Sequence, residues 1–329
     1  MTTYLQELTL RLAATMAELP EAMRACHAQY LQAAQLPDGG FPGRAGEADL
    51  YYTSFALRGL SLLGALYGPP AEKATAFLRG RLDGRETVVD FLALVYGAML
   101  LDVSAGLDVF AEAGPQWRDD VARKLEALRR DDGGYAKSHE GHASSTYHSF
   151  LVLLCLQLIG RPLSEPQRLY EFTMSQRCPD GGFREIRAAK RAGTNPTAAA
   201  VGVLRMLGAV EPEIRDSVIR FLAGMQTAEG GLRANTRIPI ADLLSTFTGV
   251  LTLSDLDALT HIDCPAVWRY ADSLQQPQGG FRGAAWDDTP DAEYTFYGLG
   301  CLALLHPLVS RAPSPVPAAQ IERSVREAR

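Results

Sequence analysis

A short glycine motif returns at regular intervals along this chain of 329 residues, and this repetition constrains the fold more than any other feature. The intervals between successive motifs are 94, 48, 49 and 49 residues. Because the first interval is about twice the others, a degenerate copy is expected near Asp83-Gly84-Arg85, giving six units of about 48 residues. The clear copies are Gly39-Gly40-Phe41, Gly133-Gly134-Tyr135, Gly181-Gly182-Phe183, Gly230-Gly231-Leu232 and Gly279-Gly280-Phe281.

The segments on either side of each motif have helical periodicity. Before the motif lies an amphipathic stretch such as 212–225, in which apolar residues recur at helical spacing between charged ones. After it lies a nearly all-apolar stretch such as 148–159, and a helix apolar on all sides must be buried on all sides. Six half-exposed helices alternating with six buried ones predict an all-α fold of two concentric rings, an (α/α)6 toroid. An open solenoid would leave its apolar concave face in water, so we expect a closed ring.

Composition places the chain in a broad class. With 47% hydrophobic and 21% charged residues it can bury a large core, and we expect residues 1–310 to form one toroidal domain. Residues 311–329, rich in proline and then charged, predict an extended tail. Five scattered cysteines, no basic-then-apolar leader and no apolar run of 18 residues predict a cytoplasmic protein without a membrane span. The net charge of −6 argues against a nucleic-acid partner.

The residues after the first motif extend the pattern to a recognisable repeat. The run Asp-Gly-Gly-Phe followed by Asp-x-Tyr-Tyr-Thr-x-Phe-Ala-Leu-x-Gly-Leu, over 38–60, resembles the prenyltransferase and squalene-cyclase repeat. The resemblance covers residues 36–308 and is closest to the β subunits of protein prenyltransferases; class II terpene cyclases share the repeat. It implies an α/α toroid with an isoprenoid cavity and, for the prenyltransferases, a helical α-subunit partner.

Polar side chains gather where each buried helix is expected to begin. We align five units on a hydroxyl residue near that point: Thr53, Ser149, Thr197, Thr246 and Thr295. The residues four, two and one positions earlier are expected to face the cavity from one rim, although Asp, Asn and Ser are also good helix caps. By unit they are Asp49, Tyr51, Tyr52; Ser145, Tyr147, His148; Gly193, Asn195, Pro196; Asp242, Leu244, Ser245; and Asp291, Glu293, Tyr294.

The resemblance implies a zinc site whose ligands this chain lacks. In protein prenyltransferases an Asp and a Cys of the fifth unit and a His of the sixth bind zinc, which lowers the pKa of the acceptor thiol. The corresponding residues are Asp242, Leu244 and Tyr294. Because leucine has no donor atom and one carboxylate does not hold zinc, we expect no metal and no other cofactor.

The cyclases instead carry Asp-x-Asp-Asp-Thr in this frame, and its middle Asp protonates an alkene or epoxide. Here the sixth unit has Asp291-Ala-Glu293-Tyr294-Thr295, so Glu293 holds the position of the acid. Burial beside Asp291 would raise its pKa enough to keep a proton. Such cyclases usually have two toroidal domains, and this chain has room for one.

A basic set follows the glycine motifs of three successive units. We expect ring closure to gather these side chains along one arc of the rim, where guanidinium groups suit diphosphate oxygens, with Tyr147 and His148 completing the site. The alternative is a solvated loop partly neutralised by Glu185. The set is Arg184, Arg187, Lys190, Arg191, Arg233, Arg237 and Arg282.

Three functions follow from these features. The first is a prenyltransferase-like protein that binds an isoprenoid diphosphate in an aromatic cavity (Tyr51, Tyr52, Phe55, Tyr147, Phe296 and Tyr297) and transfers or ionises the prenyl group without zinc. The second is a non-catalytic toroid that binds a lipid or a protein partner. The third is a class II cyclase-like enzyme with Glu293 as the acid.

Overall fold

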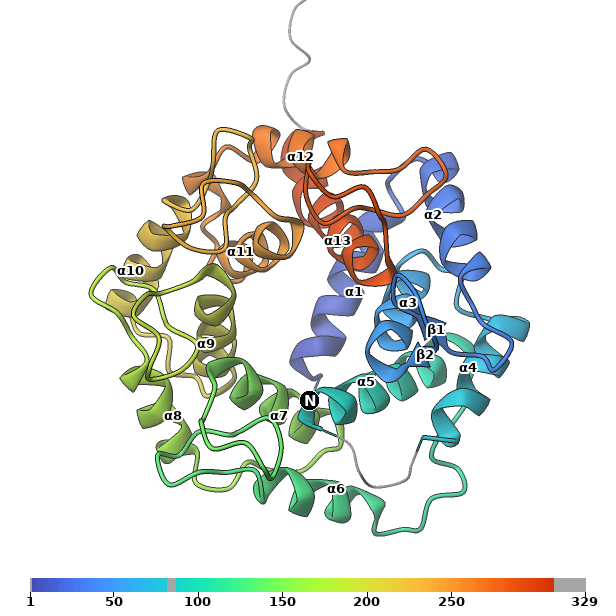
Figure 1. The fold of residues 1–329 in the computed structure, drawn as a ribbon, viewed down its shortest axis with the longest axis horizontal. Coiled ribbons are helices and arrows are strands. Elements are labelled where there is room, and N and C mark those ends of the chain that lie inside the picture. Colours follow the sequence, from blue (N-terminus) through green and yellow to red (C-terminus); the bar gives the residue numbers. More distant parts are fainter. Residues whose placement is uncertain (1, 82–86, 311–329) are drawn as a thin grey trace, which may run out of the picture.

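The structure, a computed structural model, describes residues 2–81 and 87–310 and confirms the predicted toroid (Figure 1). The expected motif copy at Asp83-Gly84-Arg85 and the tail 311–329 lie outside these ranges. Within them, the inner ring consists of α3 (Leu50–Leu62), α5 (Val88–Ala105), α7 (Thr146–Leu158), α9 (Thr194–Met206), α11 (Leu243–Asp255) and α13 (Ala292–Val309). The outer ring consists of α2 (Glu21–Ala33), α4 (Gly68–Arg79), α6 (Trp117–Glu126), α8 (Pro166–Ser175), α10 (Pro212–Ala223) and α12 (Cys264–Ser273).

The ring is closed, as predicted. Each inner helix contacts the next in sequence order, and the last, α13, packs against the first, α3. The remaining elements are small: a pair of two-residue antiparallel strands, β1 (Phe41–Pro42) and β2 (Ala48–Asp49), and a 3-10 turn, η1 (Leu259–His261).

The glycine motifs seat each unit on its neighbour. The first glycine of each clear copy has a positive φ, for example +91° at both Gly39 and Gly279. A Cβ atom on Gly39 would lie 2.1 Å from the Lys73 carbonyl oxygen on α4, the outer helix of the next unit. On Gly279 it would lie 2.6 Å from the Cys26 carbonyl oxygen on α2, so the last motif closes the seam with the first unit. Only glycine permits this backbone conformation and this approach.

The hydroxyl residues used to align the units hold the motif against its own inner helix. In the fourth unit the backbone N–H of Phe183 donates to Thr197 Oγ1 at 2.8 Å, and both residues are buried. The same bond joins Phe41 to Thr53, Tyr135 to Ser149, Leu232 to Thr246 and Phe281 to Thr295. Since a buried N–H without a partner is costly, the recurrence of a hydroxyl residue 12 positions after this N–H in the first unit and 14 positions after it in the other four has a structural cause.

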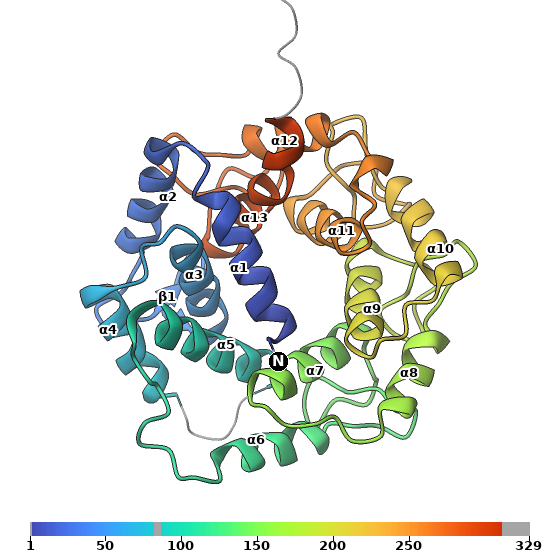
Figure 2. The same cartoon turned by 180° about the vertical axis from the view of Figure 1, so that it is seen from behind.

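An additional helix crosses one end of the ring, which the sequence analysis did not predict. This helix, α1 (Tyr4–Met16), contacts α3, α7 and α13 and lies across the hollow in both ribbon views (Figure 2). Asp255 of α11 anchors it: its carboxylate accepts from Tyr4 Oη at 2.7 Å and pairs with Arg11 at 2.9 Å. Arg205 of α9 completes the cluster at 2.7 Å. We call α1 the floor of the cavity.

One described helix, α5, is long and apolar enough to cross a membrane by length and composition alone, although no such run was identified in the sequence. Its place in the fold accounts for this composition. It is an inner-ring helix packed between α3 and α7, with 61% of the apolar window buried. Core helices of this kind need no lipid to cover them.

Candidate functional site

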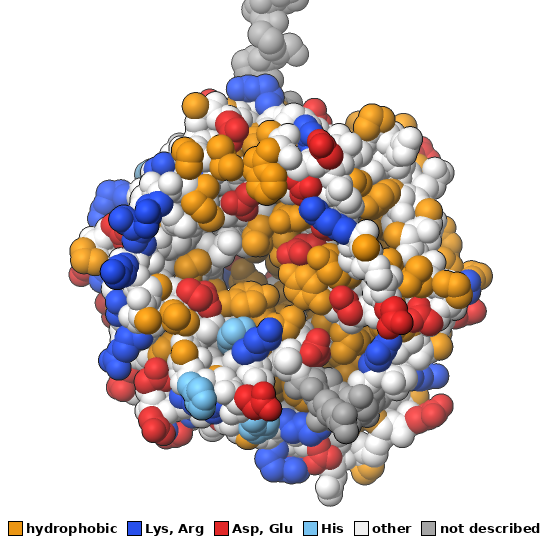
Figure 3. All heavy atoms as spheres, viewed as in Figure 1, with side chains coloured by type: hydrophobic (Ala, Val, Ile, Leu, Met, Phe, Trp, Pro, Cys, Tyr) orange, Lys and Arg blue, Asp and Glu red, His pale blue; other side chains and the backbone are white. Residues whose placement is uncertain are grey.

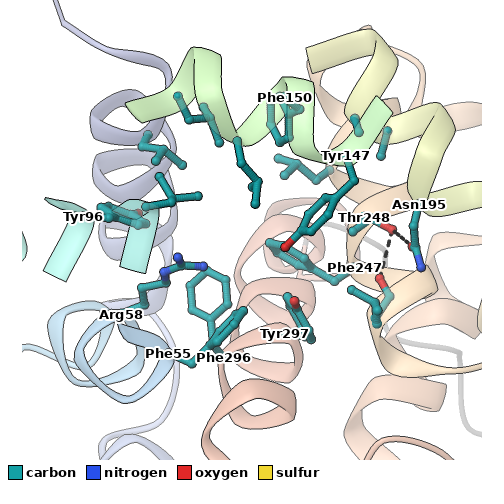
Figure 4. Close-up of a pocket in the computed structure, with 18 of the residues that line it drawn as sticks. Phe55, Arg58, Tyr96, Tyr147, Phe150, Asn195, Phe247, Thr248, Phe296 and Tyr297 are labelled. Atoms are coloured by element: carbon teal, nitrogen blue, oxygen red, sulfur yellow. Dashed lines mark hydrogen bonds between the residues drawn. The ribbon is translucent and has the colours of Figure 1, made fainter. Parts of the chain in front are cut away.

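The inner helices enclose a cavity of about 420 Å³ that opens at the end of the ring opposite α1. Figure 3 shows this face hollowed at its centre, with hydrophobic side chains around the hollow. Three residues of the floor helix, Tyr4, Leu5 and Leu8, also line the cavity. Its aromatic lining, part of which is seen in Figure 4, consists of Tyr4, Tyr51, Phe55, Tyr96, Tyr147, Phe150, Phe247, Phe296 and Tyr297.

One of the three aligned positions at the helix starts faces the cavity, not all three. The residues two positions before the aligned hydroxyl line it in all five units: Tyr51, Tyr147, Asn195, Leu244 and Glu293. The residues four and one positions before it are absent from the lining. The helical geometry explains this correction, because neighbouring residues on a helix point about 100° apart.

The residues four positions before the hydroxyl are helix caps. Asp49 accepts a hydrogen bond from the Tyr52 N–H at 2.7 Å, Asp242 from the Ser245 N–H at 2.7 Å and Asp291 from the Tyr294 N–H at 2.8 Å. Ser145 caps α7 in the same way. Of the predicted catalytic residues, Asp242 and Asp291 therefore stabilise helix ends, and the Asp291 carboxylate is also paired with Arg44 at 3.0 Å.

Glu293, the third predicted catalytic residue, lies at the cavity in a hydrogen-bonded setting. Its Oε1 atom accepts from Tyr51 Oη at 2.6 Å and from Tyr297 Oη at 3.2 Å. Burial raises the pKa of Glu293 and the nearby charge of Asp291 raises it further, against the opposing effects of the two phenols and of the Arg58 charge. Because both bonds go to Oε1, Oε2 is the oxygen available to carry a proton.

A second carboxyl group, which the sequence analysis treated only as a neutralising charge, also lines the cavity. Glu185 follows the third clear glycine motif, and its Oε1 accepts from Ser145 Oγ and from the Tyr147 N–H. Burial raises its pKa. The mouth of the cavity therefore carries two carboxyl groups and the phenols of Tyr51, Tyr147 and Tyr297.

The seven basic residues of the predicted arc do not line the cavity. Arg184 donates to the Ser175 carbonyl at 3.0 Å, Arg233 donates to the Gly224 carbonyl at 3.1 Å, and Arg282 lies 3.8 Å from the exposed Asp288. These contacts turn the guanidinium groups toward their own loops. The four others, Arg187, Lys190, Arg191 and Arg237, are exposed, and many basic side chains on this face lie along its outer margin (Figure 3).

Three predicted binding residues sit beside the mouth without lining the cavity: Tyr52, His148 and Tyr294. Burial, with the charge of Lys137, lowers the pKa of His148 to about 4, so its imidazole is neutral. Burial raises the pKa of Tyr294 to about 12, and Arg44 lies over its ring at 5.6 Å. We expect neither side chain to supply positive charge at the mouth near pH 7.

The residues at the family's zinc position do not fit zinc. The Asp242 carboxylate is engaged in capping, Leu244 presents hydrocarbon to the cavity, and Tyr294 is a neutral phenol. Across residues 2–81 and 87–310, no group of three His, Cys, Asp or Glu side chains is arranged to hold a metal ion. That the protein works without zinc stays a prediction.

The one basic side chain in the described cavity lining, Arg58 of α3, was not among the residues predicted from the sequence. Its guanidinium carbon lies 4.4 Å from the Phe55 ring centroid, 4.6 Å from that of Tyr96 and 5.7 Å from that of Phe296 (Figure 4). A signal was present: Arg58 is the one charged residue of α3 and lies seven residues after Tyr51, which places both on one helical face.

Comparisons with known proteins agree with this architecture. The family model described as the prenyltransferase alpha-alpha toroid domain matches residues 18–78 and 71–314. The β subunit of protein farnesyltransferase from Schizosaccharomyces pombe is 29% identical over 147 residues, 42% of this chain and 37% of that protein. The Pisum sativum β subunit is 26% identical over 197 residues, 58% of this chain and 46% of that protein. The chain thus aligns with less than half the length of these relatives.

Two solved structures share the fold. A Candida albicans protein geranylgeranyltransferase-I complexed with GGPP superposes with a TM-score of 0.66 at 15% identity, covering 86% of this chain and 91% of that one. A variant of the type II terpene cyclase MstE from Scytonema, in complex with geranylgeranyl dihydroxybenzoate, gives 0.60 at 12% identity, covering 92% and 99%.

The second match concerns domain number as well as fold, because one toroid accounts for nearly the whole of that cyclase chain. The two superpositions establish the fold, and the family model spans most of the chain. This chain belongs to the prenyltransferase alpha-alpha toroid family.

Proposed function

We propose that this protein binds a linear isoprenoid chain in its central cavity. The observation that carries the proposal is the cavity itself: about 420 Å³, floored by α1 and lined largely by aromatic and aliphatic side chains. Such a lining favours an extended hydrocarbon, and the volume lies within the range of small-molecule sites. The fold relatives support this proposal, because their names record GGPP and geranylgeranyl dihydroxybenzoate as bound molecules.

The direct test is calorimetric titration of the purified protein with geraniol, farnesol and geranylgeraniol. We expect saturable binding at one site per chain, tightening with chain length until the cavity is filled, because affinity grows with buried apolar area. Absence of binding by all three alcohols would contradict the proposal.

The arrangement of charge argues against a diphosphate held by the seven-residue basic arc. The arc residues point into their loops, while the mouth carries the carboxyl groups of Glu185 and Glu293. We expect an Arg184→Ala, Arg233→Ala double variant to bind geranylgeranyl diphosphate as tightly as the unmutated protein. A loss of affinity for the diphosphate, with binding of geranylgeraniol intact, would restore the arc as its site.

A second candidate function, acid-initiated cyclisation, is favoured by the geometry of Glu293. A proton on Oε2 would pass to one carbon of an alkene in the bound chain, whose π electrons form the new C–H bond and leave a carbocation on the other carbon. A second alkene would attack this carbocation to close a ring, and loss of a proton from the product cation would restore the proton count. Tyr51 and Tyr297 would stabilise the carboxylate left on Glu293.

This second function is tested with Glu293→Gln, which keeps the shape of the side chain and removes its acidity. We expect any cyclised product to fall by at least about 100-fold while isoprenoid binding is unchanged. Product formation at the unmutated rate would rule out Glu293 as the proton donor.

The relatives are named as subunits, and a helical partner for this chain stays a prediction. The mass of the complex isolated from the native host would check it.

A further inference from the structure

Arg58 is a charged side chain in an apolar cavity, and it lacks a polar partner. Its Nε atom is buried without a hydrogen-bond acceptor. Neither a hydrogen bond nor an ion pair links any atom of Arg58 to another residue in the part of the chain that the structure describes. Its contacts are the faces of Phe55, Tyr96 and Phe296, seen around the guanidinium in Figure 4.

This arrangement is unfavourable for the empty protein. Burying the Nε group of Arg58 without an acceptor costs free energy that aromatic faces repay only in part. Arg129 is a stacked arginine with polar partners. Its guanidinium carbon lies 4.7 Å from the ring centroid of Tyr135, and its guanidinium also pairs with Glu126 at 3.0 Å and donates a hydrogen bond to Ser164 Oγ. Arg58 has the stacking and lacks the anion.

Arg58 lies below the mouth of the cavity. Its Cα atom follows that of Tyr51 by seven residues on α3, about 10 Å farther along the helix. Its guanidinium reaches back to the rings of Phe55 and Phe296, close enough for its charge to lower the pKa of Glu293. The Tyr96 ring on which the guanidinium stacks shares a 2.6 Å hydrogen bond with Thr9 of the floor helix. A ligand that reached Arg58 would therefore pass the carboxyl groups at the mouth and enter the interior of the cavity.

We propose that Arg58 binds the anionic end of the ligand, a carboxylate or a phosphate, inside the cavity. The proposal rests on the proposed function and deepens it, since it names the ligand as an isoprenoid with a negatively charged terminus that enters first. The guanidinium supplies two parallel N–H donors for such a group, and the surrounding rings keep water away from the pair. The hydrocarbon end then lies toward the mouth, beside Glu293 and Tyr51.

The test compares three ligands of equal chain length by calorimetric titration: geranylgeraniol, geranylgeranoic acid and geranylgeranyl monophosphate. In the unmutated protein we expect at least one anion to bind about tenfold tighter than the alcohol or better. In Arg58→Met this advantage should disappear, so that the alcohol and the anions bind with affinities within about twofold of one another. The tighter anion identifies the head group as carboxylate or phosphate.

Two outcomes would overturn the proposal: equal affinities for anions and alcohol in the unmutated protein, or an anion advantage that survives Arg58→Met. Failure of all three ligands to bind would instead contradict the proposed function itself. Thermal unfolding provides a separate readout. Because Arg58 has no polar partner to lose, Arg58→Met should have a Tm no lower than that of the unmutated protein, whereas a purely structural role predicts a lower Tm.

Arg129→Met is the matched control for removing a stacked arginine. It should lower the Tm, because Glu126 loses its partner, and leave the preference for anions unchanged. Arg58→Lys keeps the charge without the planar pair of donors, so it should retain part of the anion advantage.

Discussion

At the scale of single residues, the cavity has carboxyl groups at its mouth and a guanidinium inside. Glu293 and Glu185 lie among phenols, and the Arg58 guanidinium stacks on rings below them, where its charge lowers the pKa of Glu293. Glu293 was predicted because the repeat frame marks its position. Arg58 was not, because the repeat motif leaves its position unspecified and the direction of a side chain on a buried helix depends on the ring that the helix joins.

The first prediction concerns the stability of the protein as a function of pH. The raised pKa of Glu293 means that folding favours its protonated form. Its contribution to stability is therefore complete below the ordinary value of 4.5 and is lost as the pH rises through the raised pKa. Glu293→Gln removes this loss, so its Tm should exceed that of the unmutated protein by about 2 °C at pH 7.

Thermal unfolding followed by circular dichroism at pH 4 and pH 7 provides the measurement. The two proteins should nearly converge at pH 4, where the carboxyl group is mostly protonated in both states. A variant that is less stable at pH 7, or a difference that does not depend on pH, would show that Glu293 is not a destabilising buried carboxyl group.

At the scale of the helices, the repeated elements were predictable and the floor was not. The amphipathic and apolar stretches predicted the outer and inner helices because burial acts on each unit in the same way. The floor helix α1 lies outside the repeat, and its docking depends on Asp255 of α11 and Arg205 of α9, which are distant in sequence. Local pattern carries no information about such a contact.

The second prediction tests the attachment of the floor. The Asp255 side chain is 4% exposed and serves Tyr4, Arg11 and Arg205, so Asp255→Ala leaves three polar groups without their partner. We expect a loss of about 3 kcal/mol in the free energy of unfolding, measured by urea denaturation. Asp216→Ala, which removes an exposed carboxylate 3.3 Å from Arg215, is the control and should cost less than about 0.5 kcal/mol. Equal effects of the two variants would contradict the structural role of the cluster.

At the scale of the whole molecule, closure of the ring converts six similar units into one enclosed cavity. The seam between the last and first units depends on Gly279, whose backbone faces the Cys26 carbonyl. The repeat spacing was sufficient to predict the number of units and the closed ring. The placement of the basic loops was not predictable, because their side chains bond to nearby carbonyls that sequence does not reveal.

The third prediction tests the seam. Gly279→Ala combines a positive φ of +91° with a Cβ atom 2.6 Å from the Cys26 oxygen, and we expect it to destabilise the protein by about 3 kcal/mol or more. Gly208→Ala is the matched control: φ is +68° and no atom lies within 4 Å, so only backbone strain of about 1 kcal/mol is expected. Similar losses in urea denaturation would show that the seam contact is unimportant.

The central claim is that the hollow of the ring holds an isoprenoid, and mass spectrometry of the lipid extracted from the natively purified protein tests it most directly. Ala198 lines the cavity on α9, and Ala198→Trp would fill the space that the hydrocarbon occupies. We predict an isoprenoid bound to the unmutated protein and absent from a folded Ala198→Trp variant. A lipid of another class, or the same isoprenoid retained by the filled variant, would contradict the account.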